Sequence, residues 1–185
     1  MDMENEQVQE NPSYWNSVII ASLITGIIVT VFSLIGGYMT INSEPSGSLF
    51  NSAQIWGTIG CLVGAIGGFI ANWHFTNEYD VTYKVGKGAL LGLLVGVVST
   101  IIIVALSQLW NVIDPSYQEA ILEWNIQNFE AMQMPAEAKE QAIASMENPN
   151  SMGNIALFAG TTFVGMAILN VISGLIGAKV FASEE

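Results

Sequence analysis

The sequence has 185 residues, of which 51% are hydrophobic and only 11% are charged, and its formal net charge is −12. Soluble domains carry roughly 25% charged residues, and here the hydrophobic residues gather in four blocks, so the composition indicates a membrane protein of a single domain. The chain has no arginine and therefore lacks the basic surface of a nucleic-acid-binding protein, and its single cysteine, Cys61, excludes a disulfide within the chain.

The N-terminal segment, residues 1–17, is polar and acidic. It lacks the positively charged start of a signal peptide, so we expect no cleavage. Such a segment buries too little apolar surface to offset the entropy of ordering, which predicts a disordered tail. Tyr14 and Trp15 then mark a membrane interface, where aromatic side chains with a polar edge are favoured.

Four apolar segments predict an all-α integral membrane protein with four transmembrane helices. As a helix, the uncharged residues 88–109 would rise about 33 Å, close to the hydrocarbon thickness of a bilayer. The polar tail and a four-helix domain of residues 18–182 then make up the chain. The predicted spans are residues 18–41, 53–75, 88–110 and 155–181.

Lysine positions predict the topology. Lys84 and Lys87 lie in the connector between the second and third spans, and Lys179 lies at the end of the fourth. Because basic residues are enriched in cytoplasmic loops, we expect this connector and both termini in the cytoplasm. Residues 111–152 then form an excursion outside the cytoplasm.

This excursion reads as two helices. Asp114 and Pro115 are typical of a helix start, because aspartate caps the helix and proline fits its first turn. Glutamates then fall on one face of an amphipathic helix over residues 117–133, and a second short helix follows over residues 136–146. This hairpin is free to pack on the bundle, lie in the interface or receive a partner. The apolar face that would meet a partner comprises Tyr117, Ile121, Trp124 and Phe129.

All four spans carry stripes of small residues, which allow helices to approach closely. The second span is the richest in glycine. We interpret the stripes as the contacts of a compact bundle, with the alternative that one of them, on the second span, faces a partner subunit. The predicted packing residues are Gly57, Gly60, Gly64, Gly67, Gly68, Gly88, Gly92, Gly96, Asn170 and Gly174.

No Asp, Glu, Lys or Arg lies deep in any span, which argues against a proton pump or a transporter of charged substrates. Asn170 is the most deeply placed amide, and we interpret it as a hydrogen-bond link between helices rather than a ligand site. The sequence offers no nucleophile–base pair, phosphate-binding loop or metal-ligand spacing. We therefore expect no catalytic residues, no cofactor and no metal site.

The layout resembles a family of small four-span membrane proteins common in Bacteroidota, a domain of unknown function (number four-one-nine-nine). The resemblance rests on the polar tail, the connector NEYDVTYKVGKGALLG, the exit from the third span at Trp110 with Asp114-Pro115-Ser116-Tyr117, the acidic excursion and the last span. The second span departs from it by being unusually rich in glycine. The resemblance implies a bacterial inner membrane and brings no catalytic residues.

These observations predict a non-catalytic accessory or structural subunit. Its partners would be the lipid bilayer and either other membrane-protein subunits or further copies of itself, held through glycine faces and the outer hairpin. The alternative is a small channel or transporter for a neutral solute, with Asn170, Thr161 and Thr162 on the solute path.

Overall fold

The computed structural model describes residues 12–48, 52–146 and 151–182, and within these ranges the chain is helical with no strand. Most of the predicted tail, residues 1–11, lies outside the described residues. The helices are α1 (Trp15–Ile41), α2 (Ser52–Gly64), α3 (Gly67–Tyr79), α4 (Val85–Ile113), α5 (Pro115–Ala131), α6 (Ala136–Met146) and α7 (Met152–Phe181).

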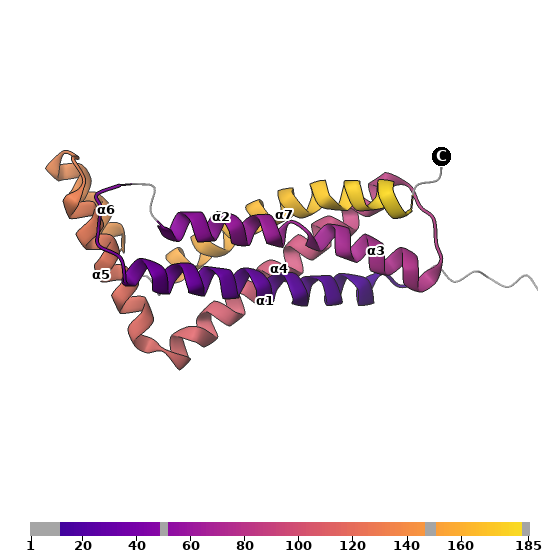
Figure 1. Ribbon diagram of the computed structural model, residues 1–185, viewed down its shortest axis with the longest axis horizontal. Helices are drawn as coiled ribbons and strands as arrows, with labels where there is room; N and C mark the ends of the chain where they lie inside the picture. Colours follow the sequence, from indigo (N-terminus) through magenta and orange to yellow (C-terminus); the bar gives the residue numbers. More distant parts are fainter. Residues whose placement is uncertain (1–11, 49–51, 147–150, 183–185) are drawn as a thin grey trace, which may run out of the picture.

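Four segments long and apolar enough to span a membrane lie side by side along the long axis of the molecule (Figure 1). They are α1, α2 together with α3, α4 and α7. Large hydrophobic side chains cover the outside of the bundle, and Ile101, Val112 and Leu157 are each more than 60% exposed. Lipid solvates such a surface and water does not. The chain is therefore an all-α, multi-pass membrane protein.

The second span is broken rather than continuous, which differs from the single helix predicted over residues 53–75. α2 ends at Gly64, α3 begins at Gly67, and the Ile66 amide donates to the Val63 carbonyl at 3.2 Å across a tight turn. Three glycines in this region, Gly64, Gly67 and Gly68, lower the helix propensity. The break leaves backbone groups without their usual helical partners inside the bundle.

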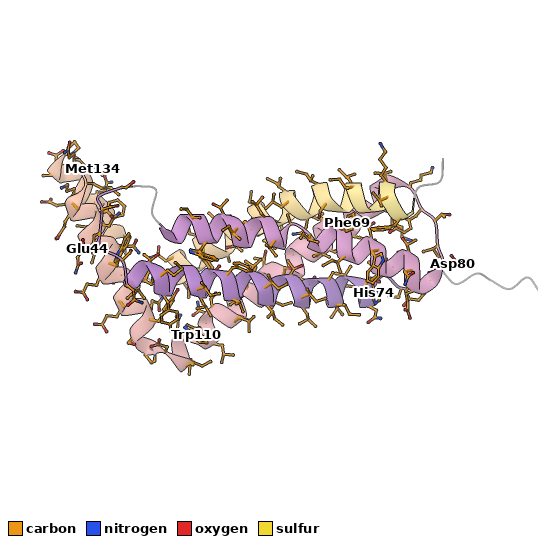
Figure 2. The ribbon with its side chains drawn as sticks, viewed as in Figure 1. Glu44, Phe69, His74, Asp80, Trp110 and Met134 are labelled. Carbon is orange, nitrogen blue, oxygen red and sulfur yellow. The ribbon has the colours of Figure 1, made fainter. Side chains whose placement is uncertain are left out.

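One end of the bundle, which we call the connector end, is where α1 begins, α7 ends and the α3–α4 connector crosses (Figure 1). Asp80 ends α3 with a φ of 48°, a left-handed conformation that a short polar side chain tolerates. The Tyr83 amide donates to the Ala182 carbonyl at 2.9 Å, so the connector is joined to the end of α7. His74 and Asp80 both lie at this end in Figure 2.

The largest fully buried hydrophobic side chains lie in the half of the bundle next to the connector end. Val18, Phe75, Leu91 and Val95 are buried there in one cluster. The Lys87 ammonium lies 4.8 Å from the centre of the Phe75 ring, where the ring face attracts a cation. Hydrophobic side chains of the chain itself therefore fill the interior of this half of the bundle.

At the opposite end, which we call the capped end, α5 and α6 run across the bundle instead of along it (Figure 1). The buried Trp124 ring on α5 donates to the Ser43 carbonyl at 2.8 Å. The Asn128 side chain accepts from the Ser46 and Gly47 amides at 3.1 and 2.9 Å. These bonds hold α5 against the loop that follows α1.

Candidate functional site

Gly88, Gly92 and Gly96 on α4 lie where its backbone meets the backbone of the last half of α7. A Cβ atom added to Gly92 would lie 2.7 Å from the Asn170 carbonyl carbon, and one added to Gly96 would lie 2.8 Å from the Ala167 Cα atom. Gly88 and Gly174 face each other in the same way, each against the other's carbonyl oxygen. Because glycine has no side chain, α4 and α7 can approach closely, and their contact is the most extensive between any two helices of the bundle.

The glycine stripe of the second span is mostly covered by the chain itself. A Cβ on Gly64 would lie 2.5 Å from the Val29 Cγ2 atom, and one on Gly60 would lie 3.1 Å from the Phe32 Cβ atom. Gly67 and Gly68 meet α1, α4 and α7 equally closely. Within this stripe, only Gly57 is left open, since a Cβ there would meet nothing within 4 Å.

Asn170 fills the break in the second span. Its side-chain oxygen accepts from the Gly68 amide at 2.7 Å, and its nitrogen donates to the Met166 carbonyl at 2.9 Å. The residue is completely buried. A backbone N–H freed by the broken helix is thus satisfied by a side chain from α7, as a lipid-embedded backbone requires. Both ends of the amide are used within the chain, which places Asn170 as a link between helices.

A second buried amide, Asn72, completes this arrangement and was not singled out from the sequence. Its nitrogen donates to the Gly68 carbonyl at 2.7 Å and to the Gly88 carbonyl at 3.3 Å. Its oxygen accepts from the Tyr83 hydroxyl at 2.8 Å. Only the presence of an amide in an apolar span could have signalled this role, because its partners come from three separate segments.

Asp114 links three segments at the capped end. Its carboxylate accepts from the Tyr38 hydroxyl at 2.5 Å and from the Ser116 hydroxyl at 2.6 Å. The Trp110 ring in turn donates to the Tyr38 hydroxyl at 3.3 Å. Asp114 and Pro115 do start α5 as predicted, but the carboxylate binds these side chains rather than capping the helix. The bonds fix the sharp corner between α4 and α5 against α1.

Lowering the pH is expected to weaken this corner. The pKa of the Asp114 carboxyl lies below its ordinary value of 3.8, because Ser116 and then Tyr38 donate hydrogen bonds to its charged form. A lowered native pKa stabilises the fold above about pH 4, and that contribution disappears as the pH falls through the lowered value. The difference in thermal midpoint between wild type and Asp114→Asn, followed by circular dichroism in detergent, should therefore shrink on acidification. A difference that stays constant down to about pH 2 would contradict this role for the charge.

The predicted partner surface on the excursion is partly used by the chain. Trp124 is only 5% exposed against the loop after α1, and the Tyr117 ring packs on Tyr38 with centroids 4.9 Å apart. Ile121 and Phe129 are partly buried. α5 folds onto the bundle through this face, and Trp124 is covered by the chain itself. Of the three places open to the hairpin, these contacts put α5 on the end of the bundle.

A pocket of about 340 Å³ opens at the capped end between α1, α4, α5 and the start of α7. Trp110, which Figure 2 places at this end below α1, contributes to its wall. The residues that line it in the described chain are uncharged and mix amides, hydroxyls, aromatic rings and aliphatic groups. Asn170, Thr161 and Thr162, predicted for a solute path, do not line it. Sequence reasoning missed this pocket because its residues come from four helices.

Within the described residues, no group of three or more His, Cys, Asp or Glu side chains is placed to hold a metal ion. No curated protein and no solved structure matches the chain. A family model described as "Protein of unknown function (DUF4199)" matches residues 16–182, which is nearly the whole sequence. The chain therefore belongs to the DUF4199 family.

Proposed function

We propose that this protein is a non-catalytic accessory or structural subunit of a bacterial inner membrane, with both termini in the cytoplasm. It associates with another membrane helix, from a larger complex or a second copy, through one face of α7. This face, which we call the α7 outer face, comprises Gly153, Leu157, Gly160 and Val164. The orientation rests on the lysines of the connector and of the last span.

The observation that carries the proposal is the bare first half of α7. In the most apolar stretch of α7, only 11% of the residues are buried inside the chain, whereas the corresponding stretches of the other three spans are 33–39% buried. No residue of α7 before Met166 is buried. The residues of the α7 outer face recur at spacings of three and four, so they form a continuous surface along the helix.

Gly160 supports a protein partner over lipid. A Cβ there would meet nothing within 4 Å, so the glycine gains no close packing inside the chain. Glycine within a helix costs about 1 kcal/mol relative to alanine. A shallow surface between Leu157 and Val164, which are 66% and 54% exposed, suits close approach of another helix.

The substitution Gly160→Leu should release the partner without unfolding the chain. The new side chain enters open space, so the monomer keeps its stability, while the filled surface keeps another helix at a distance. We expect the associated fraction, measured by native electrophoresis after extraction in mild detergent, to fall about tenfold. Gly86→Leu is the matched control, because Gly86 is also exposed and open but lies on α4 at the connector end.

Two results would contradict the proposal. One is a wild-type protein that leaves native membranes only as a monomer. The other is an unchanged associated fraction in Gly160→Leu. Gly57→Leu tests the remaining open position of the second span in the same assay, and loss of association there would move the interface from α7 to α2.

A further inference from the structure

The pocket at the capped end contains amides that the chain does not use. Gln108 and Asn111 on α4 and Gln118 on α5 line the pocket, and in the described part of the chain their side chains have no hydrogen-bond partner. All three are only partly exposed. Other amides, such as Asn72, Asn128 and Asn170, are bonded to the backbone. The free amides are therefore available to a ligand.

Aromatic rings complete the wall of the pocket. Trp110, Tyr117 and Phe158 come from α4, α5 and α7, and each contributes to the lining. Two of the three rings are held in place, because the Trp110 ring donates to Tyr38 and the Tyr117 ring packs on Tyr38. A fixed aromatic wall with a few polar groups is typical of small-molecule sites.

The chemistry of the lining selects the class of ligand. No acidic or basic side chain lines the pocket in the described chain, so a charged group would lose its hydration without gaining a counter-ion. The carboxylate of Asp114, beside Asn111 at the corner of α4 and α5, would further repel an anion. Amides both donate and accept, which matches hydroxyl groups, and rings cover the apolar faces of a compact ligand.

We infer that this pocket binds a neutral, hydroxyl-rich ligand of the size of one sugar ring. Its volume of about 340 Å³ lies at the small end of ligand sites, which span roughly 300–1,000 Å³. The same chemistry is offered by a free sugar in water and by the sugar headgroup of a glycolipid. The inference does not depend on the proposed association, because Phe158 lies on the side of α7 opposite to Gly160.

The test uses the full chain in nanodiscs of phosphatidylcholine, which avoids detergents with sugar headgroups. In one arm, methyl glucoside is titrated by calorimetry, and we expect a dissociation constant on the order of 1 mM for so small a ligand. In the other arm, a monoglucosyl diacylglycerol is added to the bilayer, and the lipid that stays bound is measured by native mass spectrometry. Binding in the first arm identifies a free sugar, and retention in the second arm alone identifies a lipid headgroup.

The variant Gln118→Leu should weaken binding about tenfold, because it removes a donor and an acceptor from the wall. Gln127→Leu is the matched control on the same helix, since Gln127 is exposed, bonds to Glu123 and lies outside the pocket. Glucuronate, which adds a carboxylate to the same ring, should bind at least tenfold more weakly than methyl glucoside. The inference is overturned if neither arm shows binding, if Gln118→Leu binds like wild type, or if glucuronate binds equally well.

Discussion

Replacing Asn170 with alanine is expected to destabilise the protein by about 2–3 kcal/mol. The substitution removes the oxygen that accepts from the Gly68 amide at 2.7 Å, and the break in the second span then leaves a buried N–H without a partner. No water reaches a completely buried residue inside the bundle to replace the bond. The free energy of unfolding, measured in mild detergent, should fall by this amount.

Hydrogen exchange separates this local effect from a general loss of packing. In Asn170→Ala, the Gly68 amide should exchange with solvent faster than in wild type, and amides far from the break should change less. Thr161→Val is the control on the same helix, because the Thr161 hydroxyl is exposed and bonds only within α7. Equal stabilities of Asn170→Ala and Thr161→Val would show that the amide does not support the break.

The membrane-spanning architecture could be predicted because it depends on the length, hydrophobicity and lack of charge of continuous segments of the sequence. Each span needs about 20 apolar residues, and the absence of charge over residues 88–109 fixes the third span before any contact is known. The start of α5 at Pro115 is equally local, since a proline at the first turn needs only its own backbone. Such features depend on neighbours in sequence.

The break in the second span could not be predicted because it depends on a distant residue. Gly64 and Gly67 weaken the helix, but a continuous helix would satisfy the same backbone groups without help. The broken arrangement persists because Asn170, more than 100 residues away, accepts from Gly68. Glycine spacing on an ideal helix therefore indicated the stripe of small residues but not the break within it.

The direction in which each surface faces was the other unpredicted feature. An amphipathic pattern shows that Trp124 lies on the apolar side of α5, but the pattern is the same whether a partner or the chain covers that side. The bond from Trp124 to the Ser43 carbonyl decides in favour of the chain. The same argument separates Gly64, which meets Val29, from Gly160, which meets nothing.

Adding one methyl group at Gly92, in the variant Gly92→Ala, is expected to destabilise the protein strongly. The added Cβ would lie 2.7 Å from the Asn170 carbonyl carbon and 3.1 Å from the Val171 Cα atom, both of which belong to the backbone of α7. A backbone cannot rotate away as a side chain does, so α4 and α7 must separate along their most extensive contact. We expect a loss of about 2–4 kcal/mol in unfolding free energy.

Gly86→Ala makes the same chemical change on the same helix where a Cβ meets nothing within 4 Å. Alanine favours a helix over glycine, so this control should keep the stability of wild type or exceed it by up to about 1 kcal/mol. The two variants therefore differ only in what the methyl group meets, and their difference in unfolding free energy measures the closeness of α4 and α7. If both variants unfold at the same denaturant concentration, the two helices do not touch at Gly92. Close packing of α4 on α7 would then explain neither the glycine stripe nor the position of Asn170.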